Sequence, residues 1–118
     1  MQVDFYETQR GRCPFIEFID ALPSKAQAKC LKYVEVLEEK GFTLPTSYIK
    51  KISGTDKIWE LRPEFGGTEY RLLFFEISEE KVIIVHGIIK KDKKLRQKDI
   101  RVAEARIKDF IERESENL

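Results

Sequence analysis

Positive side chains interrupt or end three consecutive apolar segments of the chain, where their chemistry suits phosphate. Arg62 lies in the segment IWELRP, Arg71 lies inside TEYRLLFFEI, and Lys90 and Lys91 close KVIIVHGIIKK. An arginine within a hydrophobic strand is unfavourable unless an anion or a paired acid satisfies it. Three such placements on neighbouring strands predict a single surface that binds a polyanion.

A surface of this kind can support cleavage of RNA by the RNA's own 2'-hydroxyl. The 2'-oxygen attacks the adjacent phosphate, and fixed cations stabilise the charge that builds on the phosphoryl oxygens. The planar fork of arginine matches phosphate oxygens, whereas lysine is a point charge that can also release a proton. We therefore assign Arg71 and Arg62 to hold the phosphate, and Lys90 or Lys91 to neutralise it or to move a proton.

Other roles for these side chains remain open. Each arginine can instead form a salt bridge with a nearby acid, for which the candidates are Glu60, Glu69 and Glu76. His86 is a candidate acid or base, because the pKa of histidine is near neutral and because it lies on the strand that carries Lys90. Its neighbours Val85 and Gly87 are equally compatible with a core histidine.

Lysines outside these strands extend the basic region. Thirteen bases and nine acids lie between residues 41 and 101, although the net charge of the whole chain is only +1. A solvated surface gives the same count, but such segregation is also typical of a phosphate-binding face. The candidates to hold an RNA backbone are Lys50, Lys51, Lys93 and Lys94.

Several other functions lack the residues that they require. His86 is the only histidine and has no ligand-spaced partners, so no metal site is expected. Gly66 and Gly67 join two strands rather than opening a helix, so no nucleotide cofactor is expected either. No apolar run approaches the roughly 20 residues that cross a bilayer, and no signal peptide is evident. We expect a cytoplasmic protein in which Cys13 and Cys30 are reduced.

Hydrophobic patterning predicts the elements that position these residues within one domain spanning residues 1–118. The expected order is a strand (3–7), two helices (14–22 and 24–41), a connection (42–56), three antiparallel strands and a helix containing residues 100–111. Ser24 and Gln27 have the spacing of a capping box. Apolar residues occupy both sides of the last two strands, with Ile84 and Ile88 expected to share one side. The sequence therefore predicts an α+β fold with helices on both faces of a small sheet.

The strand block resembles the RelE/ParE superfamily of bacterial toxins, in particular its HigB-like, phage-associated branch. The matching elements are IWELRP, EYRLLFF, VHGIIKK and the following DIRVAEARIKDF, and the two preceding helices also match the family order. The resemblance implies a RelE-like sheet packed by two N-terminal helices and a C-terminal helix. It also implies a toxin that cuts messenger RNA, commonly while the message is read in the ribosomal A site.

The resemblance further implies a cognate helix-turn-helix antitoxin, through which the chain would meet DNA only indirectly. A second interpretation stays open, namely a non-enzymatic inhibitor of gyrase like ParE or a phage-derived interaction module. It rests on two departures from RelE itself. Ile58 and Glu60 stand where RelE carries lysines, and the basic segment after Lys91 lacks the tyrosine or histidine seen in relatives.

Overall fold

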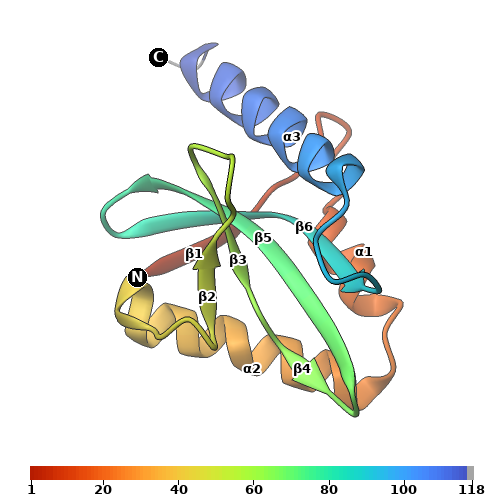
Figure 1. Cartoon of the computed structure of the whole chain (residues 1–118). Coiled ribbons are helices and arrows are strands. Elements are labelled where there is room, and N and C mark those ends of the chain that lie inside the picture. Colours follow the sequence, from red (N-terminus) through yellow and green to blue (C-terminus); the bar gives the residue numbers. More distant parts are fainter. Residues whose placement is uncertain (117–118) are drawn as a thin grey trace.

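The computed structural model describes residues 1–116 as a six-stranded mixed sheet with helices on both faces (Figure 1). The elements along the chain are β1 (Gln2–Phe5), α1 (Pro14–Asp20), α2 (Ser24–Lys40), the 3-10 turn η1 (Gly41–Thr43), β2 (Ile49–Lys51), β3 (Ile58–Leu61), β4 (Glu64–Phe65), β5 (Thr68–Ser78), β6 (Lys81–Lys90) and α3 (Gln97–Glu116). The strand order is β1-β6-β5-β3-β2, and β4 pairs with β5. The predicted α+β architecture is confirmed.

The three predicted strands β3, β5 and β6 pair antiparallel, whereas β1 adds to β6 in parallel. Two short strands were not predicted. Strand β2 lies within the expected connection and pairs with β3, and β4 forms a hairpin with the start of β5. The turn of that hairpin contains Gly66 and Gly67 at φ of 60° and 82°, a conformation that favours glycine.

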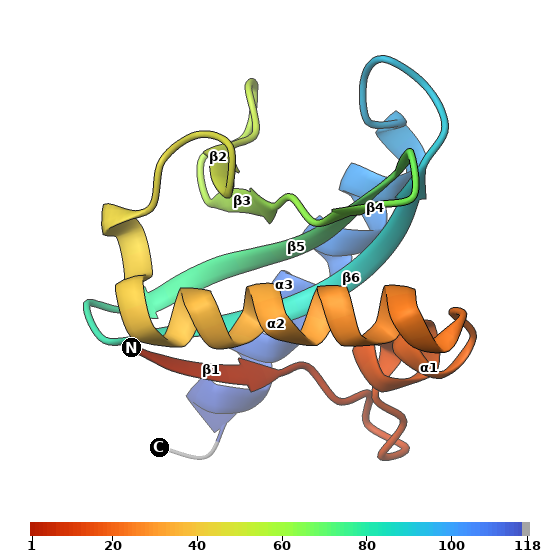
Figure 2. The same ribbon diagram turned by 90° about the horizontal axis from the view of Figure 1, so that it is seen from below.

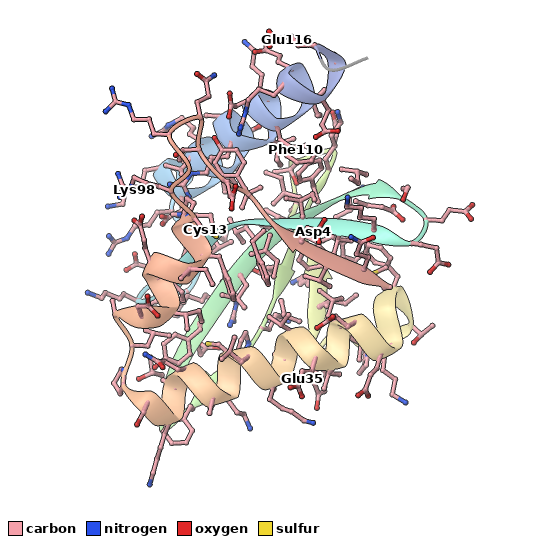
Figure 3. The ribbon with its side chains drawn as sticks, turned by 180° about the vertical axis from the view of Figure 1, so that it is seen from behind. Asp4, Cys13, Glu35, Lys98, Phe110 and Glu116 are labelled. Carbon is pink, nitrogen blue, oxygen red and sulfur yellow. The ribbon has the colours of Figure 1, made fainter. Side chains whose placement is uncertain are left out.

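Each face of the sheet has its own hydrophobic core. Leu72 and Phe74 belong to the core under α1 and α2, whereas Leu73 and Phe75 belong to the core under α3. Figure 2, in which α2 crosses in front of the sheet, shows α3 on the far side. Phe110 points from α3 toward the sheet (Figure 3), and its ring centroid lies 5.7 Å from that of Phe75. The expectation of helices on both faces is therefore confirmed.

A β-bulge in β6 changes which residues face each core. Leu73 pairs with His86 and Phe74 pairs with Ile84, so Val85 has no partner on β5. The extra residue reverses the alternation for the rest of the strand. Ile84 consequently packs under α1 and α2, and Ile88 packs under α3. The prediction that these two isoleucines share a side is wrong, because it assumed unbroken alternation.

The capping box is also wrong. Helix α2 begins at Ser24 with Pro23 as its N-cap, and no side chain caps it by a hydrogen bond. The amide of Gln27 instead donates to the carbonyl oxygen of Leu22, 3.0 Å away. The helix ends at Lys40, one residue before the predicted end, and Gly41, whose φ is 56°, is its C-cap. Helix α1 ends at Asp20, two residues earlier than expected.

A polar cluster fixes the second half of α3 against the chain that follows β1. The hydroxyl of Tyr6 donates to Asp109 at 2.6 Å, and Arg113 donates to Asp109 and to the carbonyl oxygen of Glu7. The hydrogen bond from Tyr6 lowers the pKa of Asp109. This attachment also limits where the connection between β6 and α3 can lie.

Cys13 and Cys30 are free thiols, as predicted. In the part of the chain that the structure describes, none of the helices has the length and apolar character needed to cross a bilayer.

Candidate nucleic-acid interface

Six predicted cationic residues line one groove of about 470 Å³ on the α3 face of the sheet. The groove lies between β2, the end of β3, the end of β6 and the connection that leads into α3. We call it the cationic groove. Its positive side chains are those of Lys50, Lys51, Arg62, Lys90, Lys93 and Lys94. The structure thus brings together residues that lie up to 44 positions apart in the sequence.

Strand register explains why these side chains meet. Lys50 pairs with Glu60 across β2 and β3, and Lys90 pairs with Glu69 across β6 and β5. Cross-strand partners share a face of the sheet. The bulge at Val85 places Lys90 on the face covered by α3. Lys90 lies two residues after Ile88, which packs under α3, and residues two apart on a strand share a face. Without that bulge, regular alternation would send Lys90 to the opposite face.

Glu60 is the one acidic residue among those that line the cationic groove in the described chain. It is 8% exposed and lies between two arginines. Its Oε1 is 3.5 Å from Nε of Arg62, and its Oε2 is 3.6 Å from Nε of Arg71. Arg62 also donates to the carbonyl oxygen of Thr46 at 2.9 Å. Sequence reasoning treated Glu60 as a salt-bridge partner and as a departure from RelE but not as a residue of the site, although its position two residues before Arg62 in an extended segment puts both on one face.

Arg71 lies beneath the groove rather than in its lining. Its side chain is 2% exposed, and its Nη2 donates to Glu69 at 3.1 Å. Its Nη1 donates to the carbonyl oxygen of Tyr70 at 2.8 Å. The alternative of a salt bridge, left open by the sequence, is therefore what the structure shows for Arg71. The hydrogen bond from Arg71 lowers the pKa of Glu69.

His86 also lies outside the groove lining and is held on both ring nitrogens. Its Nε2 is 3.0 Å from Oδ1 of Asp99, and Nη1 of Arg106 is 3.0 Å from its Nδ1. Arg106 donates in addition to the carbonyl oxygen of Val85 at 2.8 Å. An arginine always donates, so the neutral ring accepts at Nδ1 and donates from Nε2 to the carboxylate.

Burial lowers the pKa of His86, and the nearby charge of Arg106 lowers it further, whereas the hydrogen bond that the ring donates to Asp99 raises it. His86 therefore joins β6 to α3 as a neutral ring. Sequence reasoning missed both partners. Their separation of seven residues, two helical turns, was a signal that Asp99 and Arg106 share a face of the helix.

Lys91 faces a second depression, of about 320 Å³, on the other side of the same connection. Phe18, Gly87 and Lys98 are among its lining residues, and we call it the side pocket. Of the nine predicted site residues, six therefore line the cationic groove, Lys91 lines only the side pocket, and Arg71 and His86 line neither.

The charged side chains that line the groove are mostly positive. Several ammonium groups and one guanidinium surround a single carboxylate, which is a suitable arrangement for binding and polarising a phosphodiester. Residues 1–116 contain no group of three or more histidine, cysteine or acidic side chains that could hold a metal ion.

Comparison with known proteins identifies a family. No curated protein matches the chain. The family model described as phage-derived protein Gp49-like (DUF891) matches residues 17–108, a segment that contains every predicted site residue. Since the match covers most of the chain, the protein belongs to the Gp49-like family of phage-derived proteins (DUF891), a family known as RelE-like toxins.

Proposed function

We propose that this chain is the toxin of a type II toxin-antitoxin system, of the HigB-like branch, and cleaves messenger RNA in the ribosomal A site. The observation that carries the proposal is the cationic groove. Three separate segments of the chain supply its six positive side chains, and one buried carboxylate lies among them. Sequence-independent binding of RNA depends on such neutralisation of phosphates.

The proposed reaction needs no metal and no cofactor. The 2'-oxygen of one nucleotide attacks the adjacent phosphorus while the bond from phosphorus to the 5'-oxygen breaks, which yields a 2',3'-cyclic phosphate and a 5'-hydroxyl. One proton leaves the 2'-hydroxyl and one reaches the 5'-oxygen. Arg62 and Lys90 are placed to stabilise charge on the phosphoryl oxygens. Lys90, or Lys91 from the adjoining side pocket, supplies the proton, and Glu60 is the carboxylate that the groove offers as an acceptor.

Arg71 and His86 act in this proposal by positioning other groups. Arg71 holds Glu60 from below and places a fixed positive charge under the groove. His86, bound to Asp99 and Arg106, holds the first half of α3 against β6. Both therefore determine the shape of the groove, and the RNA backbone itself is held by Lys50, Lys51, Lys93 and Lys94.

The partners follow from the same proposal. A net charge of only +1 favours a site completed by the ribosome, because a free nuclease needs more phosphate contacts of its own. A helix-turn-helix antitoxin would hold the toxin inactive in the cytoplasm, and contact with DNA would be made by that antitoxin.

The test is induced expression in a bacterial host without an antitoxin. We expect growth arrest together with new messenger RNA ends inside codons, measured by primer extension. The variants Lys50→Gln and Lys90→Gln should relieve both effects. Lys25→Gln is the matched control, because Lys25 is an exposed lysine of α2 that lies outside the groove lining. Growth arrest with intact transcripts would refute the nuclease.

A second function, inhibition of gyrase without catalysis, is favoured by two observations. Arg71 is neutralised by two carboxylates, and both ring nitrogens of His86 are occupied. A supercoiling assay with purified gyrase and a cell-free translation assay together separate the two functions. Inhibition of supercoiling with unaffected translation would select this alternative.

A further inference from the structure

The side pocket opens beside the cationic groove, on the other side of the connection between β6 and α3. Phe18 of α1, the last residues of β6 and the first turn of α3 line it. Figure 3 shows Lys98, at the start of α3, on the same side of the molecule as the chain that enters α1 at Cys13. Helices far apart in the sequence thus enclose one small depression of about 320 Å³.

The two depressions share part of their walls. Lys90, Lys94 and Leu95 line both the side pocket and the cationic groove. An RNA strand whose phosphate lies against Lys90 and Lys94 in the groove can therefore extend into the side pocket and remain next to positive side chains. One ligand can therefore reach both depressions.

The floor of the side pocket is aromatic and closely packed on the backbone. A Cβ atom at Gly87 would lie 2.4 Å from Cδ2 of Phe18, so the ring of Phe18 rests directly on the strand. Space, rather than an unusual φ, requires the glycine here. Phe18 is only half-buried, and the exposed part of its ring lines the pocket. An aromatic ring at a basic surface is a platform on which an unpaired base stacks.

The rim of the side pocket keeps an excess of positive charge. Arg96 donates to Asp92 at 2.8 Å, and the carboxylate of Asp99 bonds His86. Lys91, Lys94 and Lys98 have no ion-pair partner within residues 1–116. Three unpaired ammonium groups thus surround the aromatic floor, which suits a nucleotide with its flanking phosphate.

We propose that the side pocket binds one unpaired base of the RNA strand whose phosphate lies in the cationic groove, with the base stacked on Phe18. The inference rests on the proposed function and adds to it a base-binding subsite. An acidic peptide of a partner protein fits the lysines equally well. It does not account for a flat aromatic floor continuous with a phosphate groove.

The test measures binding of a short single-stranded RNA to the purified chain by fluorescence anisotropy at low salt. The same RNA lacking its bases serves as the second probe. We expect the intact RNA to bind more tightly, and Phe18→Leu to weaken its binding about tenfold while leaving the abasic RNA unchanged. Gly87→Ala, which displaces the ring, should act in the same direction. Ile16→Ala, an exposed change on the same helix, is the control.

Each other outcome overturns one claim. Equal binding of intact and abasic RNA by the unaltered chain rejects the base subsite but leaves the groove and the proposed function standing. No salt-dependent binding of either RNA rejects both the base subsite and the groove as an RNA-binding surface of the isolated chain, whereas the proposed function is decided separately by the expression test. A Phe18→Leu variant that binds RNA normally but loses a co-expressed antitoxin assigns the side pocket to a protein partner. The abasic probe keeps the test decisive even where a variant fails to fold.

Discussion

Arg71 and Glu60 form a buried ion pair beneath the cationic groove, with Nε of the arginine 3.6 Å from Oε2 of the glutamate. The arginine is 2% exposed and the glutamate 8% exposed. Nε of Arg71 has no hydrogen-bond partner, so the pair is held by charge at moderate distance rather than by a direct hydrogen bond. The buried charges beneath the groove therefore compensate one another, and removing one of them leaves its partner as an uncompensated charge in an apolar environment.

Arg71→Met should lower the free energy of unfolding by roughly 3 kcal/mol, because it leaves Glu60 buried with Arg62 as its remaining partner. The double variant Arg71→Met, Glu60→Gln should recover part of that loss, since the uncompensated charge is then absent. Urea unfolding of the three proteins measures both effects. A single variant as stable as the unaltered chain would show that the pair contributes nothing.

Protonation of His86 should destabilise the fold. Its pKa is lowered from the ordinary value of 6.5, so the unfolded chain binds the proton more readily than the folded one. The stability that the neutral ring contributes is present above pH 6.5 and is lost as the pH falls below it. Denaturant midpoints measured between pH 7 and about pH 5 should fall accordingly.

The variant His86→Gln is the control for this pH dependence, because the chain has no other histidine. Its profile should be nearly flat over the same range. The carboxylates with lowered pKa values, Glu17, Glu69 and Asp109, titrate below their ordinary values of 4.5, 4.5 and 3.8 and so act only at more acidic pH. A flat profile for the unaltered chain would contradict the prediction.

Groove lysines should determine how RNA binding responds to salt. Replacing Lys50 and Lys90 together by glutamine should reduce the slope of log K against log salt by about 1.4, since each phosphate contact on a single strand contributes about 0.7. Lys25→Gln should leave the slope unchanged. Titrations at several salt concentrations give these slopes. Equal slopes for the double variant and the control would remove these lysines from the interface.

The two cysteines should differ in reactivity. Cys30 is fully buried in α2, and burial raises its pKa to about 11, whereas Cys13 is partly exposed before α1. The thiolate is the reactive form, so an alkylating reagent at neutral pH should modify Cys13 first and Cys30 only on unfolding. Mass spectrometry of the folded chain after brief alkylation tests the order. Early modification of Cys30 would indicate local opening of α2.

Much of the architecture was accessible from the sequence because long, regular patterns specify it. The stripes of α1, α2 and α3 and the apolar runs of β5 and β6 predicted helices on both faces of a sheet. Strands β2 and β4 were missed because three and two residues carry too little pattern to separate from a loop. Their pairing is decided by the neighbouring strand and not by their own residues.

The lining of the groove was predicted where a positive side chain lies on the short edge strand β2, at the end of a strand or in a connection. Arg62 and Lys90 lie at or beyond the ends of strands, where solvent is near, and both line the groove. Arg71 lies in the middle of β5, and its fate depended on whether acids lay within reach on β3 and on its own strand. Which acids reach Arg71 depends on the pairing register between β3 and β5, and the spacing of residues along one segment does not reveal that register.

The surplus residue in β6 has a consequence for how this protein can vary. Deleting the codon for Val85 would leave each remaining pair between β5 and β6 in place, because Val85 is paired with none of them. Keeping Val85 while straightening the strand would turn His86 and Lys90 toward α1 and α2. Relatives can therefore share the whole sheet and still differ in the side of the molecule on which their positive residues stand, and that side depends on whether the strand carries the bulge rather than on its length alone.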